Sequence, residues 1–220
     1  MKNKLSILKK SPLFNQIAEI ELETMLTCLS VQEKTFPKNT FIFTTEDKVS
    51  TVGIVLTGSV HIIKEDFWGN RTIIAKIEAG DIFAETFSCA QVKRLPISVM
   101  AAEKSEIMFI DYKKIISTCS SACIFHTRLI QNMLTIIANK NIMLTQKIEY
   151  MSKRTTREKL LSYLSAQAQM ANSNSFAIPF NRQELADYLS VDRSAMSNAL
   201  CKLRDEGILL FERNHFTFKN

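Results

Sequence analysis

The sequence contains 220 residues, of which 28 are Lys or Arg and 22 are Asp or Glu, so its formal net charge is +6. No apolar run approaches the roughly 20 residues that cross a bilayer, and the basic N-terminus lacks the apolar stretch of a signal peptide, which excludes a membrane protein and predicts a cytoplasmic one. Five cysteines without a repeating spacing favour a reducing compartment over a disulfide framework, and the basic excess favours a polyanionic partner.

The first half of the chain combines one helical segment with several short strands. Ser11 and Pro12 suit a helix start, and apolar residues at helical spacing continue to Leu29. Short runs rich in β-branched and aromatic residues then alternate with turn signals. They predict strands at 40–43, 52–56, 60–63, 71–75 and 106–110. Strands at this spacing predict a sandwich or a small barrel.

The segment 124–151 contains no glycine or proline, and its pattern predicts one long helix. Its apolar residues recur at alternating steps of four and three, with Asn141 as the single polar member, which is typical of a two-stranded coiled coil. This dimer seam consists of Ile130, Leu134, Ile137, Asn141, Leu144, Ile148 and Met151. A second apolar line on a neighbouring face consists of Leu129, Met133, Ile136 and Met143. One face can therefore meet a partner helix while the other packs on the β domain. The alternative is a helix buried inside a single domain.

The segment 181–203 has the pattern of two short helices joined by a tight turn. Asn181 precedes the first helix and Glu184 follows three positions later, which is the form of a capping box. Ser190-Val191 makes the turn, and Asp192 can cap the second helix. The expected buried positions are Leu185, Ala186, Leu189, Met196, Ala199, Leu200, Cys201 and Leu203. The segment 209–218 alternates about a polar turn like a β-hairpin, so the C-terminal part predicts a winged helix-turn-helix.

The predicted DNA contacts lie at the start of these two helices. Arg193, Ser194, Ser197 and Asn198 share the exposed face of the second helix. A helix in the major groove needs donors and acceptors at its N-terminal end, where Arg suits guanine and Asn suits adenine. Arg182, at the start of the first helix, can face a phosphate. The alternative is an ordinary helical hairpin in which these polar side chains are solvated surface.

Three motifs carry a resemblance: Leu-Thr-Gly-Ser-Val at 56–60, Gly-Asp-Ile-Phe-Ala-Glu at 80–85, and the segment 181–203. With them, nearly the whole chain resembles the Crp/Fnr family of bacterial transcription regulators. The resemblance implies an α+β fold: a β-roll (jelly roll) like a cyclic-nucleotide-binding domain over 1–123, a long dimerisation helix over 124–151 and a winged helix-turn-helix over 152–220. It also implies a homodimer that reads a palindromic operator in double-stranded DNA, with RNA polymerase as a further candidate partner.

The sequence departs from this family at the effector site. Members that bind cyclic AMP have a glycine before the glutamate that matches Glu85, and an Arg-Ser or Arg-Thr pair ten residues after it. Here these positions are Ala84, Leu95 and Pro96. Leucine offers no charge to a phosphate and proline has no N–H to donate, so the resemblance implies an effector other than cyclic AMP. Arg94 is one residue away and could supply the missing charge only if the strand register turned it inward.

The same resemblance places Lys140 and Asn141 at connector positions that touch the ligand in cyclic-AMP binders. Lys140 could pair with Glu85 or with an acidic ligand, and a solvated helix lysine is the alternative. The resemblance therefore implies an effector pocket made by Ala84, Glu85, Leu95, Pro96, Lys140 and Asn141.

Cysteine chemistry offers an alternative signal. Cys119, Cys123 and His126 would share one face of a single helix, and with Cys89 they could form a metal site or a redox pair. A helix start at Ser120 would remove Cys119 from that face. We favour structural thiols without a metal, and a thiol- or metal-based redox sensor that regulates DNA binding is the alternative function. No nucleophile-and-base pair, phosphate loop or paired carboxylate indicates an enzyme.

Overall fold

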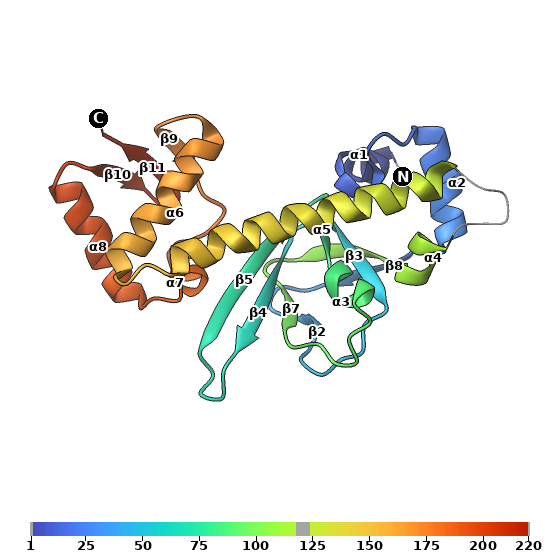
Figure 1. The fold of residues 1–220 in the computed structure, drawn as a ribbon, viewed down its shortest axis with the longest axis horizontal. Coiled ribbons are helices and arrows are strands. Elements are labelled where there is room, and N and C mark those ends of the chain that lie inside the picture. Colours follow the sequence, from blue (N-terminus) through green and yellow to red (C-terminus); the bar gives the residue numbers. More distant parts are fainter. Residues whose placement is uncertain (1, 118–123, 220) are drawn as a thin grey trace. The chain divides into compact units, whose positions relative to one another are not determined.

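The structure is a computed structural model that describes residues 2–117 and 124–219. The chain packs as two compact units, Met1–Lys64 with Ala75–Asn141, and Glu65–Ile74 with Ile142–Asn220. Helix α5 (Ile124–Met151) contributes residues to both units and coincides with the long helix expected from the heptad pattern (Figure 1). Across the described ranges, no helix is long and apolar enough to cross a membrane. The three-part division of the chain at residues 123 and 151 stays a prediction.

The first unit is built on two four-stranded sheets, in the orders β1-β8-β3-β6 and β2-β7-β4-β5. Their strands are β1 (Gln32–Phe36), β2 (Phe41–Phe43), β3 (Thr51–Thr57), β4 (Ser59–Glu65), β5 (Arg71–Glu78), β6 (Ile82–Phe83), β7 (Ser98–Ala101) and β8 (Ser105–Asp111). All five predicted strands are present, and the neighbours β1 and β8 pair antiparallel. Strand β1 was not predicted because its Gln-Glu-Lys-Thr-Phe sequence is mostly polar and exposed.

Five short helices belong to the same unit: α1 (Lys2–Lys10), a 3₁₀ turn (Pro12–Phe14), α2 (Glu19–Leu29), α3 (Glu85–Cys89) and α4 (Tyr112–Ile116). The helix expected from Ser11 to Leu29 is therefore broken. Pro12 starts only a 3₁₀ turn, and Gln16 follows in the left-handed region at φ 59°. A left-handed residue cannot continue an α-helix, so the chain begins a new one at Glu19.

The first turns of α5 complete the core of this unit. Leu129, Met133 and Ile136 are buried against apolar side chains of α1, α2, β3 and β8, as the second apolar line predicts. Met143, on the same line, is 60% exposed, so the prediction is wrong for that residue. The reason is that the core reaches along α5 only as far as Ile137.

The second unit contains three helices and a small sheet, together with the last turns of α5 and the segment Glu65–Ile74 that includes the start of β5. Its elements are α6 (Thr156–Ala171), β9 (Ser175–Ala177), α7 (Arg182–Leu189), α8 (Arg193–Asp205), β10 (Leu209–Glu212) and β11 (His215–Phe218). The hairpin β10–β11 is the expected wing, and β9 adds a third strand in the order β10-β11-β9.

Local capping explains where α7 and α8 begin. The Asn181 side chain accepts a hydrogen bond from the Glu184 N–H at 3.0 Å, and Glu184 accepts from the Asn181 N–H at 2.9 Å. The Asp192 carboxylate accepts from the Ala195 N–H at 2.7 Å. The buried faces are as predicted for six of the eight positions: Leu185, Ala186, Leu189, Met196, Leu200 and Leu203. Ala199 is partly buried, and Cys201 is exposed, which makes its prediction wrong.

Candidate nucleic-acid interface and effector pocket

The start of α8 presents polar side chains to solvent. Arg193, Ser194 and Asn198 are exposed, and Ser197 is partly buried. All four lie within the first two turns, where the free N–H groups of a helix also point outward. The short turn after α7, in which Ser190 takes the left-handed conformation at φ 49°, sets the start of α8. This face can donate hydrogen bonds to base edges and to phosphates.

Arg182 occupies a different environment from these residues. Its guanidinium carbon lies 4.7 Å from the ring centre of Phe211 and 5.0 Å from that of Phe216, both on the wing. Burial lowers the pKa of Arg182, yet a guanidinium remains charged at neutral pH. The residue therefore joins the start of α7 to the wing by cation–π contacts. A contact between Arg182 and a phosphate stays a prediction, and the aromatic residues of the wing were the overlooked signal for this stacking.

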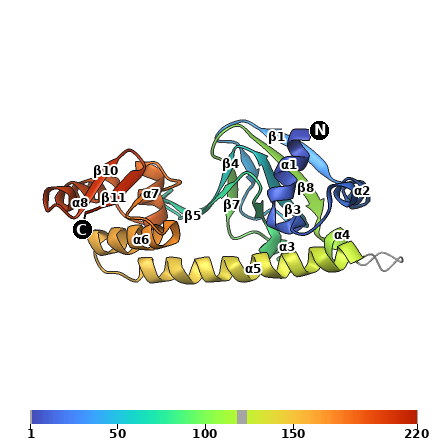
Figure 2. The same ribbon diagram turned by 90° about the horizontal axis from the view of Figure 1, so that it is seen from above.

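The predicted effector pocket holds an internal ion pair (Figure 2 shows α3 beside α5). The Lys140 ammonium, on α5, donates to Glu85 Oε2 at 2.9 Å and to the Ile82 carbonyl at 2.6 Å. The hydroxyl of Thr86 donates to the other oxygen of Glu85 at 2.9 Å. Glu85 is only 2% exposed, so its charge depends on these partners. Of the two partners expected for Lys140, the structure shows Glu85.

The remaining pocket positions carry no cation. Ala84 adopts the left-handed conformation at φ 65°, which favours glycine, so the backbone keeps the shape of a glycine turn without the glycine. Leu95 is buried and its N–H donates to the Asp47 carbonyl at 3.1 Å, whereas Pro96 is exposed. Arg94 is turned outward, with its side chain 75% exposed and paired with Glu46 at 2.5 Å. Arg94 therefore does not replace the missing arginine of the pocket.

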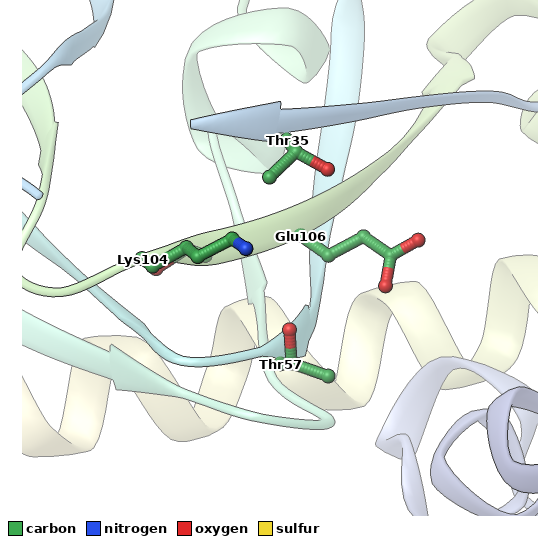
Figure 3. A pocket seen from close by; sticks show the side chains of 5 residues that line it. Thr35, Thr57, Lys104 and Glu106 are labelled. Carbon is green, nitrogen blue, oxygen red and sulfur yellow. The ribbon is translucent and has the colours of Figure 1, made fainter. Parts of the chain in front are cut away.

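A separate cavity of about 400 Å³ lies where strands β1, β3 and β8 come together (Figure 3). It is lined by Thr35, Thr57, Lys104, Ser105 and Glu106. None of these residues belongs to the predicted effector pocket. The carboxylate of Glu106 already accepts a hydrogen bond from the Lys4 ammonium at 2.8 Å, so the cavity is a polar hollow whose acidic group is neutralised from within the chain.

Two of the cysteines in the thiol- or metal-sensor hypothesis, Cys119 and Cys123, lie outside the described residues. Cys89 is partly buried, and burial together with the charge of Glu85 raises the pKa of its thiol. A raised pKa reduces the thiolate fraction on which redox reactivity depends. Among the residues that the structure describes, no three His, Cys, Asp or Glu side chains are grouped so that they could hold a metal ion.

The seam of α5 presents an apolar strip. Leu134, Leu144 and Ile148 are 63%, 48% and 69% exposed. Ile130, Ile137 and Met151 are partly buried, and Asn141 is exposed. Large aliphatic side chains repeated at heptad spacing on an open helix face are suited to a second helix of the same kind.

Two protein-family models match the chain. Residues 33–122 match the cyclic nucleotide-binding domain, and residues 158–220 match the Crp-like helix-turn-helix domain. A search of curated protein sequences found no match.

Solved structures show the same fold. FixK2 from Bradyrhizobium japonicum is 20% identical, with a TM-score of 0.66 over 86% of this chain and 93% of its own. CLP, a c-di-GMP responsive global regulator from Xanthomonas campestris, is 16% identical, with a TM-score of 0.71 over 90% and 99%. A CooA variant from Carboxydothermus hydrogenoformans is 19% identical, with a TM-score of 0.70 over 88% and 86%.

Proposed function

The chain belongs to the Crp/Fnr family of DNA-binding transcription regulators, and on this premise we propose that it is a homodimer that reads a palindromic operator through the first turns of α8. The observation that carries the proposal is the exposure of Arg193, Ser194 and Asn198 at the N-terminal end of a capped helix in a winged helix-turn-helix. Ser197 completes the proposed base-reading face, and Arg182, the first residue of α7, is the proposed phosphate contact. RNA polymerase is the proposed further partner, and the cytoplasm is the proposed location.

Selection of duplexes from a random-sequence pool tests the DNA-reading proposal. The wild-type protein should enrich a two-fold symmetric site, and Arg193→Ala should reduce the preference for that site roughly tenfold or more, because a bidentate contact to guanine is lost. Arg204→Ala is the matched control, since it removes the same charge from the last turn of α8. Arg204 is paired with Asp205, so Arg204→Ala should leave the sequence preference unchanged. An equal effect of the two variants on sequence preference would remove Arg193 from the base-reading set.

The seam of α5 supports the homodimer. Leu134→Glu should place a charge in the proposed interface and convert the dimer to a monomer in analytical ultracentrifugation. Thr135→Glu introduces the same charge at the next, exposed position and should leave the dimer intact. A wild-type protein that sediments as a monomer at micromolar concentration contradicts the proposal.

We further propose that the roll does not respond to cyclic AMP. Leu95 and Pro96 supply neither a charge nor an N–H to a phosphate, Arg94 pairs outward with Glu46, and the Glu85 carboxylate is engaged by Lys140. Isothermal titration of the wild-type protein with cyclic AMP should give no binding heat at millimolar concentration. Saturable binding in the micromolar range would overturn this part of the proposal.

A further inference from the structure

A cluster of four aromatic rings joins three helices of the second unit. Tyr150 of α5 lies 5.8 Å from Tyr163 of α6, and Tyr163 lies 5.5 Å from Tyr188 of α7, measured between ring centres. Phe180, just before α7, stacks on Tyr188 at 4.7 Å. Aromatic pairs at these distances attract one another beyond their area of contact. The cluster therefore fixes the position of α7, the helix that precedes the recognition helix.

One lysine of α5 lies against this aromatic cluster, and no carboxylate among the described residues pairs with it. The Lys147 ammonium lies 3.9 Å from the ring centre of Tyr188, and it donates to the carbonyls of Ile73 at 2.5 Å and Ile74 at 3.0 Å. Among the described residues, Lys147 has no charged partner. Strand β5, which supplies the two carbonyls, is the edge strand of its sheet, so it has backbone acceptors to spare.

Lys147 remains a cation at neutral pH although burial disfavours its charge, because two carbonyl dipoles and one aromatic ring offset part of that cost. Burial lowers the pKa of Lys147 to about 8, so the amine is mostly protonated at neutral pH. The titratable group that faces it is Tyr188, whose pKa burial raises to about 12, and burial also raises the pKa values of Tyr150 and Tyr163 in the same cluster. All three are neutral at physiological pH, and an ammonium against a desolvated ring face is a favourable contact.

We propose that Lys147 is a positioning residue for DNA reading: its ammonium ties the start of β5 to Tyr188 and so holds α7, and with it α8, in a single arrangement on the C-terminal turns of α5. The group of Lys147, the four rings and the two carbonyls is called the Lys147 hub. The β4–β5 hairpin contributes the two carbonyls to the hub, and α5 contributes Lys147. Tyr188 links the hub to α7 of the helix-turn-helix. The inference rests on the proposed DNA-reading function, which it deepens.

The physical reason is pre-organisation. A recognition helix that is already fixed relative to its neighbours loses less conformational entropy when it binds DNA. Releasing Tyr188 from Lys147 removes one of the contacts that fix α7, so the helix-turn-helix samples more orientations. Coupling between sites of this kind typically changes affinity by about 5- to 150-fold. We expect an effect near the lower end, because the rings still contact one another without the lysine.

The test compares Lys147→Met, Lys147→Arg and the control Lys153→Met. Methionine keeps the length of the side chain and removes the charge and donors, arginine keeps both, and Lys153 is a partly exposed lysine just beyond α5. Hydrogen–deuterium exchange of the full-length free protein reports the hub without any ligand. Lys147→Met should speed exchange in α7 and at residues 72–75 together by roughly tenfold, whereas Lys147→Arg and Lys153→Met should stay within twofold of wild type.

Binding to the duplex selected by the wild-type protein is the second readout. Lys147→Met should bind it roughly tenfold more weakly with an unchanged sequence preference, and Lys147→Arg should restore the affinity. If Lys147→Met does not fold, Tyr188→Leu should reproduce both effects while Tyr188→Phe, which keeps the ring, should not.

The outcomes separate the two proposals. Unchanged exchange in α7 for Lys147→Met, or an equal defect in Lys147→Arg, overturns the positioning role. A selection that enriches no duplex overturns the proposed DNA reading, while the exchange experiment still decides whether the hub couples β5 to α7.

Discussion

The predicted effector pocket of the roll and the start of α8 differ in the burial of their polar side chains. In the roll, the carboxylate of Glu85 is buried and bonded to Lys140 and Thr86. At the start of α8, Arg193 and Asn198 are exposed. A buried charge must find its partner inside the chain, whereas an exposed one can remain solvated until DNA arrives. In the predicted pocket the buried carboxylate is therefore satisfied by groups of the same chain, whereas the polar side chains at the start of α8 remain open to solvent.

The largest expected effect on stability comes from removing Lys140, the partner of the buried Glu85. Lys140→Met leaves Glu85 buried with only Thr86 as a hydrogen-bond donor to its side chain among the described contacts, so the free energy of unfolding should fall by about 3 kcal/mol. Urea unfolding at neutral pH followed by circular dichroism measures the change. The double variant Lys140→Met/Glu85→Leu should recover most of the loss, and Lys113→Met, at an exposed lysine, should stay within about 0.5 kcal/mol of wild type. A loss below about 1 kcal/mol would show that the pair contributes no more than an exposed ion pair does.

Lys147, the second lysine of α5, should make the stability of the protein depend on pH. The pKa of Lys147 is about 8 in the folded protein and 10.5 ordinarily, so between these values the unfolded chain binds more protons than the folded one. Stability should therefore rise with pH from about 8 to about 10.5, by about 2 kcal/mol from this residue, and Lys147 should contribute no slope below that window. The measurement is the difference in unfolding free energy between wild type and Lys147→Met at pH 7.5 and pH 10. A difference that does not change with pH would contradict the buried position of this ammonium.

A substitution on the open face should change binding and leave stability alone. Asn198→Ala removes a donor and acceptor from α8 and should lower discrimination between the selected duplex and one with a changed base pair by about 1–2 kcal/mol. Its unfolding free energy should stay within about 0.5 kcal/mol of wild type because the side chain is exposed. Fluorescence anisotropy with both duplexes measures the first effect. A stability loss without a change in discrimination would assign Asn198 to the fold.

The smallest expected effect is a gain. Ala84 is held in the left-handed region at φ 65°, so Ala84→Gly should stabilise the first unit by about 1 kcal/mol by removing the steric penalty on the Cβ atom. Thermal unfolding measures the change, and cyclic AMP should not increase it because Leu95 and Pro96 remain. A destabilised variant would mean that the alanine methyl group makes packing contacts worth more than the backbone strain.

Sequence patterns predicted much of the second unit because its signals are local. The capping pair Asn181–Glu184, the cap at Asp192 and the alternation of the wing are decided by neighbours a few residues apart. Cys201 was misplaced because an apolar residue type at an internal helix position does not reveal which face turns outward. In the first unit, strand β1 was missed because pairing with β8, whose residues lie 69 to 77 positions further along the chain, outweighs its polar composition.

The candidate sites divide in the same way. The residues of the recognition face follow from helix periodicity, and the loss of the Arg-Ser pair follows from reading Leu95 and Pro96 in place. The outward turn of Arg94, the stacking of Arg182 on the wing and the hub at Lys147 involve partners from distant segments. The sequence around a helical lysine does not indicate which aromatic ring or which carbonyl groups will contact its ammonium in the fold.

The sequence by itself determined the types of element, the heptad seam, the helix-turn-helix and the departures from a cyclic-AMP site, because each depends on spacing along the chain. Only the tertiary structure decided how the charges are satisfied. Lys140 meets Glu85 and Lys147 meets Tyr188 although both lysines lie on one helix, a heptad apart. The physical reason is that the state of a buried charge depends on whichever groups the fold brings within hydrogen-bonding distance, and in both cases those groups come from segments far along the chain.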